Sequence, residues 1–224
     1  GERIARGVEN KQGFMIVQHL PYLSSKRIVL ASQSPRRREI LDLLELKHDV
    51  VVSGFEENLD KSMFSHPSEY VLENARRKAE EVAKRLIGSD TPPDLVIGSD
   101  TVVVLDNKIL EKPLSEAEAF TMLKSLSNRN HTVLTSVALF LKDAKKCSAS
   151  FYEATNVRFA ELNDDLIWEY IRTREPMDKA GAYGIQGIGG SLVKGVDGCY
   201  FNVMGFPMHR FATELAELVD RGAV

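Results

Sequence analysis

Hydrophobic and polar residues follow two different periods along this chain, and the two periods predict both strands and helices. Short apolar runs bounded by turn residues predict strands, and apolar residues that recur every three or four positions predict helices. Strands are expected over 27–32 and 49–53, within 94–110, and over 131–141 and 150–162. Helices are expected from Pro35 to about Leu44, from Pro67 to about Ile87, over 163–173, and after Ser115 and Pro207. Because the order lacks the regular alternation of a purely parallel fold, it predicts an α/β domain with a mixed sheet.

Turn signals divide some of these runs. The apolar run that starts at residue 94 meets "GSDT" (98–101), where we expect one strand to end before a second begins. Asp106-Asn107 then predicts a hairpin turn. A second hairpin is expected within 189–205, with its turn near Asp197-Gly198. Ser115 opens "SEAE", a capping box that predicts the start of a helix.

Composition narrows the class of protein. The chain has 224 residues, of which 43% are hydrophobic and 27% charged, so one ordinary globular core is expected. The formal net charge of −3 argues against a general nucleic-acid binder, so any anion site must be local. Cys147 and Cys199 form no CxxC pattern, which suits a reducing, cytoplasmic compartment. No apolar run of about 18 residues predicts a membrane-spanning helix.

The N-terminal stretch differs from the rest of the chain. Residues 1–24 contain only one short apolar patch, "GFMIV", and are expected to form a poorly ordered or loosely docked extension. An interfacial membrane anchor is the less favoured alternative for this patch. The folded domain is therefore expected to span 25–224.

Three consecutive arginines follow Pro35, at a predicted helix N-terminus. Free backbone amides and the helix dipole favour anions there, so arginines are unfavourable unless an anion binds. We expect Ser32 and Ser34 to offer hydroxyl donors, Arg36 and Arg37 to grip phosphate oxygens, and Arg38 to face solvent. The alternative is a solvated charge run that nearby glutamates balance.

Acidic and basic residues elsewhere could complete a polyphosphate site. A triphosphate brings a divalent metal, and hard metals need oxygen ligands. Asp100 in "GSDT" is the best candidate, with a turn-forming aspartate as the alternative, and Glu57 is a loop carboxylate that is often merely solvated. Lys112 precedes a proline and is stiffly placed, whereas Lys78 lies on a charged helix where a surface lysine is the simpler interpretation.

A glycine-rich loop over 175–190 is of the kind that lets backbone approach a ligand. It carries Asp178 and Lys179. Gln186 could read a base edge through its donor and acceptor, and Tyr183 could pack on a base or on the core. The glycines alone are weak evidence, because turns also use them.

Eight segments together resemble the Maf family of nucleoside triphosphate pyrophosphatases. They are "LASQSPRRREIL", "EEN", "ENARRKA", "GSDTVV", "LEKP", "HTVLTSV", "EPMDKAGAYGIQG" and "FNVMGFP", in the family's order over about 28–211. The resemblance implies an elongated mixed β-sheet flanked by helices, with two lobes and a central cleft, similar to the inosine triphosphate pyrophosphatase architecture. Two departures are the N-terminal extension and a longer segment around 140–159, which resembles eukaryotic relatives.

The same resemblance assigns expected roles to individual residues. Asp100 matches the proton acceptor. The phosphate-contacting turn matches Ser32, Arg36 and Arg37, and the other charged cleft residues match Glu57, Lys78 and Lys112. Positions tied to substrate choice match Arg37, Thr101 and Gln186, and the residues found there are similar to those of the dTTP/UTP branch.

The resulting hypothesis is hydrolysis of dTTP or UTP, or of modified pyrimidine nucleotides, to the monophosphate and pyrophosphate. Mg²⁺ or Mn²⁺ is the expected cofactor, held by Asp100 and Glu57. The expected partner is a small nucleoside triphosphate, with no nucleic acid or membrane and with a homodimer left open. The alternatives are a nucleotide-binding regulator of cell division without significant turnover and, disfavoured by the net charge, a nucleic-acid-binding protein.

Overall fold

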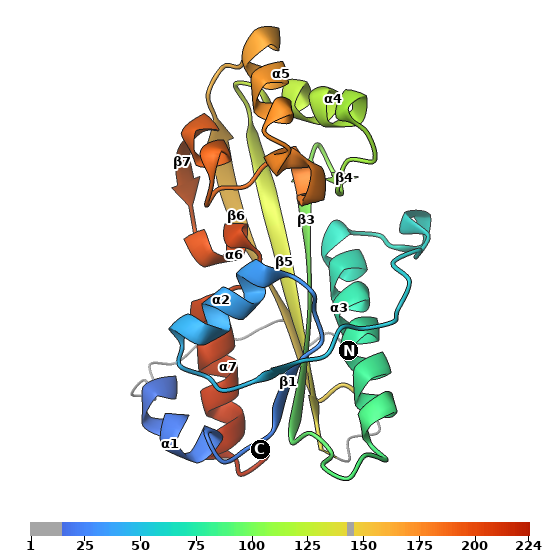
Figure 1. Ribbon diagram of the computed structural model, residues 1–224, viewed down its shortest axis with the longest axis vertical. Helices are drawn as coiled ribbons and strands as arrows, with labels where there is room; N and C mark the ends of the chain where they lie inside the picture. The colour runs from blue at the N-terminus through green and yellow to red at the C-terminus, as the bar shows by residue number, and fades with distance from the viewer. Residues whose placement is uncertain (1–14, 143–145) are drawn as a thin grey trace, which may run out of the picture.

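One mixed sheet runs the length of an elongated molecule (Figure 1). The computed structural model describes residues 15–142 and 146–224. The sheet has seven strands in the order β2-β1-β3-β5-β6-β7, with β4 paired to β3. Their bounds are β1 (Ile28–Leu30), β2 (Asp49–Val50), β3 (Leu95–Leu105), β4 (Lys108–Leu110), β5 (Asn130–Leu141), β6 (Ala149–Phe159) and β7 (Val193–Asp197).

Helices pack on both faces of this sheet. The α-helices are α1 (Leu20–Leu23), α2 (Pro35–Leu43), α3 (Pro67–Leu86), α4 (Glu116–Leu126), α5 (Asp164–Arg172), α6 (Tyr200–Met204) and α7 (Met208–Asp220). Short 3₁₀ helices lie at η1 (Ile16–His19), η2 (Lys61–Met63), η3 (Glu175–Asp178), η4 (Ala180–Ala182) and η5 (Ile188–Leu192). No helix among the described residues is both long and apolar enough to cross a bilayer.

The long strands β3, β5 and β6 pair antiparallel, while β1 joins β2 and β3 in parallel. One hydrophobic core gathers β1, α2 and α7 around Leu30, Ile40 and Phe211. A second core gathers α4 and α5 around Leu123 and Ile167. The two cores lie at opposite ends of the sheet, which confirms the expected two-lobed mixed α/β arrangement (Figure 1).

Most predicted elements are confirmed. Helix α2 begins at Pro35 after Ser34, and α3 and α5 cover the expected ranges. The hydroxyl of Ser115 accepts from the Glu118 amide at the start of α4. Asp106 and Asn107 both have positive φ, 49° and 61°, as the tight turn between β3 and β4 requires. The second predicted strand is shorter than expected, because only Asp49 and Val50 pair with β1.

The expected break at "GSDT" is wrong, since β3 runs without interruption from Leu95 to Leu105. Gly98 marks a place where helix α3 approaches strand β3 closely, and it does not form a turn. A Cβ built there would lie 2.2 Å from the carbonyl oxygen of Ala75 and 2.7 Å from Cβ of Ala79. The missing side chain therefore lets helix α3 pack directly on the strand.

The hairpin expected within 189–205 is also wrong. Strand β7 is followed by Gly198, with φ of 123°, and then by helix α6 in place of a return strand. Asn202 of α6 is fully buried and donates to the carbonyl oxygen of Val133 and the hydroxyl of Thr155. These long-range bonds hold the segment as a helical turn.

The N-terminal stretch differs from the expected extension over residues 16–23. Ile16 and Leu23 are buried in the core that contains α7, and His19 pairs with Asp220 at 3.2 Å. The hydroxyl of Tyr22 donates to the carbonyl oxygen of Val224. Residues 16–23 therefore pack as part of the domain, and residues 1–14 of the predicted extension lie outside the described residues.

Candidate active site

A gap along one edge of β3 locates the site. On that edge β1 pairs with 95–97 and β4 pairs with 103–105. Between these partners no described strand pairs with 98–102, although β5 continues along the opposite edge. Asp100 and Thr101 lie in this gap. A cavity of about 580 Å³ opens there.

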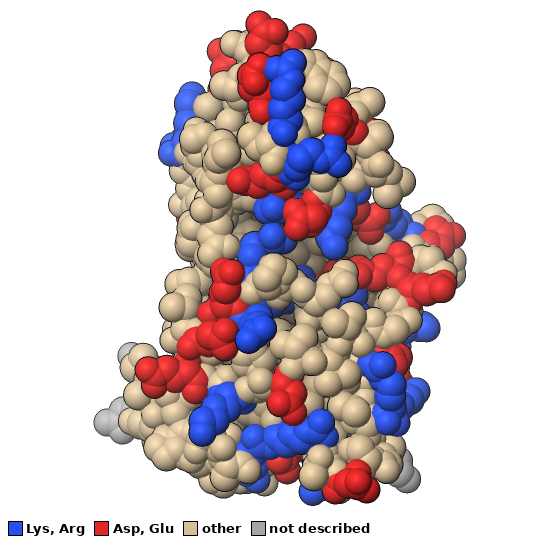
Figure 2. Space-filling view, in the orientation of Figure 1, with Lys and Arg blue, Asp and Glu red and all other residues tan. Residues whose placement is uncertain are grey.

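All of the expected site residues line this one cavity. They come from the β1–α2 turn, the loop before α3, α3, β3, the segment after β4 and the glycine-rich loop. They are Ser32, Arg36, Arg37, Glu57, Lys78, Asp100, Thr101, Lys112 and Gln186. Figure 2 shows the surface hollowed between the upper and lower parts of the molecule, with Lys and Arg side chains in and beside the hollow.

The alternation of β3 sends its side chains to two different helices. Asp100 shares a face with Gly98 and points toward α3, where it meets Lys78. Thr101 points to the opposite face and accepts a hydrogen bond from Arg37 of α2. The gap in the sheet lets both faces contribute to one cavity.

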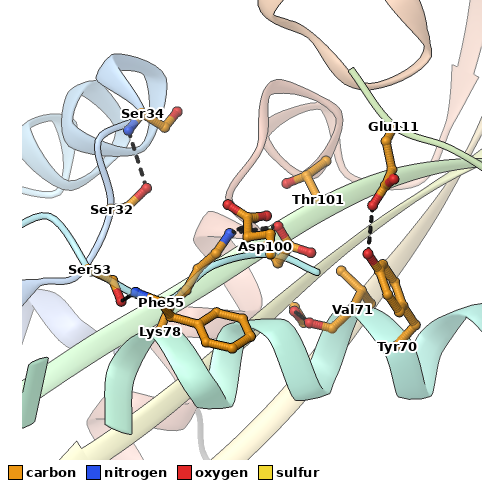
Figure 3. A network of polar contacts seen from close by, with 12 residues as sticks. Ser32, Ser34, Ser53, Phe55, Tyr70, Val71, Lys78, Asp100, Thr101 and Glu111 are labelled. Carbon is orange, nitrogen blue, oxygen red and sulfur yellow. Dashed lines mark hydrogen bonds and ion pairs between the residues drawn. The ribbon is translucent and has the colours of Figure 1, made fainter. Parts of the chain in front are cut away.

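Lys78 binds two carboxylates at once. Its Nζ lies 2.9 Å from Oδ1 of Asp100 and 2.9 Å from Oε2 of Glu57. The side chains of Lys78 and Asp100 are only 8% and 9% exposed, whereas that of Glu57 is 49% exposed. Figure 3 shows Lys78 reaching from α3 toward Asp100 on β3. No described residue donates to Oδ2 of Asp100, so this oxygen is free to accept a proton or a hydrogen bond.

The environment shifts the pKa values of the Asp100 and Glu57 carboxylates in opposite directions. Burial raises the pKa of Asp100 above its ordinary value, and the nearby Lys78 only partly opposes this shift. Burial would also raise the pKa of Glu57, but Lys78 and Lys112 more than offset it and lower that pKa overall. Asp100 is therefore the better proton acceptor of the pair, and Glu57 is the more firmly ionised carboxylate.

The three arginines of α2 have three different surroundings. Arg37 is buried, and it donates to the carbonyl oxygen of Gly205 at 2.9 Å, to Ser32 Oγ at 3.0 Å and to Thr101 Oγ1 at 3.0 Å. Arg38 is exposed beside Asp42, as expected. Arg36 lines the cavity. Its Nη1 lies 4.0 Å from Oδ2 of Asp178, which is too long for a hydrogen bond.

Arg37 is largely committed to contacts within the protein. Three of its five N–H donors bind Gly205, Ser32 and Thr101, which leaves two N–H groups for a phosphate. These contacts join the β1–α2 turn, β3 and the residue after α6. Burial lowers the pKa of Arg37 from its very high ordinary value, and Asp100 counteracts that shift.

Several donors in the cavity remain available to an anion. Arg36 and Lys112 line it, and no described carboxylate lies within hydrogen-bonding distance of either head group. Ser32 already accepts from Arg37 and from the Ser34 amide, so its own O–H can point to a ligand. The side chain of Ser34 makes no capping bond, which leaves amides free at the α2 N-terminus.

The glycine-rich loop forms the remaining wall. Tyr183 packs in the core, where its hydroxyl lies 2.8 Å from Nε2 of His131. Burial lowers the pKa of His131 to about 4, so the imidazole is neutral near pH 7. Gln186 lines the cavity, and its Nε2 donates to Oε2 of Glu39 at 3.1 Å.

Sequence reasoning did not find two acidic residues near the site. Glu111 lines the cavity and accepts from the Tyr70 hydroxyl at 2.6 Å (Figure 3). It also pairs with Lys61 at 2.5 Å. Its place beside Lys112 in "EKP" was the available signal. Glu39 lies on α2 and gives no sequence signal, because its partner is 147 positions away.

Asp100 and Glu57 are carboxylates in the cavity that could hold a divalent cation. Among the described residues, no group of three His, Cys, Asp or Glu side chains could hold a metal by itself. The carboxylates of Asp100 and Glu57, however, lie close together, since both contact the ammonium group of Lys78. Two carboxylates with phosphate and water oxygens fit the way Mg²⁺ is commonly bound beside substrate.

Comparisons with known proteins identify the family of this chain. The family model described as Maf-like protein matches residues 27–218. The "Probable bifunctional dTTP/UTP pyrophosphatase/methyltransferase protein" of Homo sapiens is 48% identical over 202 residues, which cover 88% of this chain but only 32% of the human protein. The "dTTP/UTP pyrophosphatase" of Thermococcus kodakarensis is 50% identical over 181 residues, covering 81% of this chain and 91% of that one. Among solved structures, the Staphylococcus aureus Ham1 protein matches with a TM-score of 0.47 and 16% identity, over 88% of this chain and all of that one.

Proposed function

The chain belongs to the family of Maf-like proteins, and from this premise we propose that it hydrolyses dTTP and UTP to the nucleoside monophosphate and pyrophosphate. The relatives named dTTP/UTP pyrophosphatase support the substrate and the reaction. Modified pyrimidine triphosphates belong to the same proposal.

One observation carries this proposal. A single cavity combines a buried, partly free carboxylate with separate cations that form no hydrogen bond to a described carboxylate. Asp100 supplies the carboxylate, and Arg36 and Lys112 supply the cations. A polyphosphate needs the cations, and its hydrolysis needs a group that activates water.

The chain's own residues suggest how the reaction proceeds. Water bound at Oδ2 of Asp100 attacks the α-phosphorus and gives its proton to that carboxylate. The new bond joins the water oxygen to phosphorus, and the bond from phosphorus to the α–β bridging oxygen breaks. Arg36 and Lys112 offset the charge that develops on the departing pyrophosphate. Lys78 keeps Asp100 in place through the 2.9 Å contact.

Mg²⁺ or Mn²⁺ is part of the proposal. Asp100 and Glu57 would hold it, and when bound it would supply positive charge that offsets the negative charge of the phosphates. Lys78 would then meet a competing cation, so a rearrangement of its contact to Glu57, the more exposed carboxylate, is expected.

Base choice forms a second part of the proposal. Gln186 and Thr101 line the same cavity as the phosphate-binding residues. A pyrimidine edge with O2, N3–H and O4 matches an amide or a backbone pair. A purine needs a larger pocket, and an unpaired buried donor costs about 1–3 kcal/mol, enough for tenfold discrimination or more.

The compartment and assembly are proposals as well. Cys147 and Cys199 are unpaired among the described residues, which suits the reducing cytoplasm. A homodimer is proposed from the family resemblance alone. The net charge of −3 supports a small-molecule partner over a nucleic acid.

A pyrophosphate-release assay with Mn²⁺ or Mg²⁺ across common and modified nucleoside triphosphates tests the function. We expect dTTP and UTP to be preferred, and Asp100→Asn to lower turnover on the order of 10²-fold or more while the protein stays folded. Tight triphosphate binding with no release would instead support the nucleotide-binding regulator. A preference for purine triphosphates would overturn the proposed base choice.

A further inference from the structure

Gln186 has a side-chain partner outside the cavity. Its Nε2 donates to Oε2 of Glu39 at 3.1 Å, and Gln186 lines the cavity whereas Glu39 does not. We propose that Glu39 fixes the orientation of the Gln186 amide and so makes the cavity select bases that carry an N–H at the recognised edge. This inference rests on the proposed function and assigns Glu39 as a positioning residue for its substrate choice.

The chemistry of the contact decides which end of the amide faces the base. An ionised carboxylate only accepts hydrogen bonds, so the amide atom beside it must be the NH₂ group. The carbonyl oxygen Oε1 is then the other pole of the amide. No described residue donates to Oε1, so this oxygen is available as an acceptor on a residue that lines the cavity.

The backbone that carries Gln186 is held independently of Glu39. The carboxylate of Glu175 accepts from the amides of Ile188 and Gly189, at 2.9 Å each. A Cβ at Gly187 would lie 2.2 Å from Oε2 of Glu175, so this loop packs closely on that side chain. What Glu39 adds is therefore the orientation of the side chain and not the path of the loop.

The position of Glu39 also links base and phosphate recognition. It lies three residues after Arg36, and residues at this spacing share one face of a helix. Helix α2 thus presents a phosphate-binding cation in its first turn and the amide-orienting carboxylate one turn later. A ligand held by Arg36 would have its base read by a side chain tied to the same helix.

An acceptor at Oε1 discriminates among pyrimidines. Thymine and uracil carry a donor at N3–H, which pairs with a carbonyl oxygen. Cytosine carries a bare acceptor at N3, so two acceptors would face each other. A mismatch of this kind is worth tenfold or more in kcat/KM. The expected result is a strong preference for dTTP and UTP over dCTP and CTP.

Glu39→Lys provides the sharpest test, because a lysine donates where the glutamate accepts. The ammonium would attract Oε1, turn the amide around and present NH₂ to the base. We expect the ratio of kcat/KM for dTTP to that for dCTP to fall by a factor on the order of ten or more. Glu39→Gln can still accept from Nε2, so it should keep most of the wild-type ratio.

Matched controls separate orientation from charge. Asp42→Lys makes the same charge change on the same helix, beside Arg38 and outside the cavity lining, and should leave the ratio unchanged. In a Gln186→Leu background, Glu39→Lys should have no further effect on the ratio. A dependence on Glu39 that persists there would overturn the proposal.

The outcomes distinguish this inference from the proposed function. If wild type hydrolyses dTTP and UTP but Glu39→Lys lowers dTTP and dCTP turnover equally, Glu39 is merely structural and only this inference fails. If wild type prefers dCTP or releases no pyrophosphate from dTTP, the proposed function fails, and the inference fails with it. A selective loss of the preference for dTTP in Glu39→Lys, with its retention in Glu39→Gln, supports both.

Discussion

Replacing Lys78 by methionine isolates the electrostatics of the buried carboxylate. The ammonium lies 2.9 Å from Asp100, and both side chains are less than one tenth exposed. At that separation an effective dielectric constant of about 20 corresponds to an attraction of roughly 6 kcal/mol. Lys78→Met removes the attraction but leaves the carboxylate buried. Breaking a buried pair in this way lowers the free energy of unfolding by about 3–5 kcal/mol.

The stability lost in Lys78→Met should depend on pH, and the direction of that dependence follows from the pKa of Asp100. The pKa of Asp100 is already raised by burial, and removal of Lys78 raises it further. An acid with a raised pKa holds its proton more tightly in the folded state, so stability falls as pH rises between its unfolded and folded pKa values. Lys78→Met should therefore lie further below wild type at pH 8 than at pH 5.

Urea unfolding at the two pH values measures this difference. Lys84→Met is the matched control, because Lys84 lies on the same helix, is 73% exposed and pairs with Glu80, so its loss should stay below about 1 kcal/mol. Adding Asp100→Asn to Lys78→Met should recover most of the loss. A loss in Lys78→Met as small as in the control, or one that the second substitution does not reduce, would refute the reasoning.

Other residues give further predictions. Arg37→Lys should lower the free energy of unfolding by at least about 1.5 kcal/mol, because an ammonium cannot replace three divergent hydrogen bonds. Arg36→Gln should instead raise the KM for the triphosphate and leave the urea midpoint unchanged. His131, with its pKa lowered from 6.5 to about 4, should reduce wild-type stability by about 3 kcal/mol as pH falls through that range, since the unfolded chain takes up the proton first. The variant His131→Phe should show a flatter profile of urea midpoint against pH, and an unchanged slope would contradict the assignment. Gly98→Ala should lower the Tm by at least about 4 °C in calorimetry, because its Cβ would meet the Ala75 carbonyl oxygen at 2.2 Å; a wild-type Tm would show that α3 can move away.

Local chemistry explains why so many elements could be predicted. Pro35 after Ser34 marks a helix start, Asp106-Asn107 tolerates the positive φ of a tight turn, and apolar runs mark the long strands. Each of these signals acts within a few residues of its own position. The prediction of a turn at "GSDT" was wrong because the glycine there is required by a distant contact. Gly98 packs against helix α3, which lies about 20 positions earlier in the sequence.

The sequence by itself determined which side chains could bind a polyphosphate and activate water. It supplied Asp100, Lys112, Arg36 and Arg37, and these residues do meet in one cavity. Only the tertiary structure decided which of these side chains are bound to other parts of the protein and which remain available to a ligand. Arg37 is occupied by Gly205, 168 positions away, and Gln186 by Glu39, 147 positions away. Such pairings arise when the sheet brings distant segments together, and no local pattern of hydrophobicity or charge encodes them.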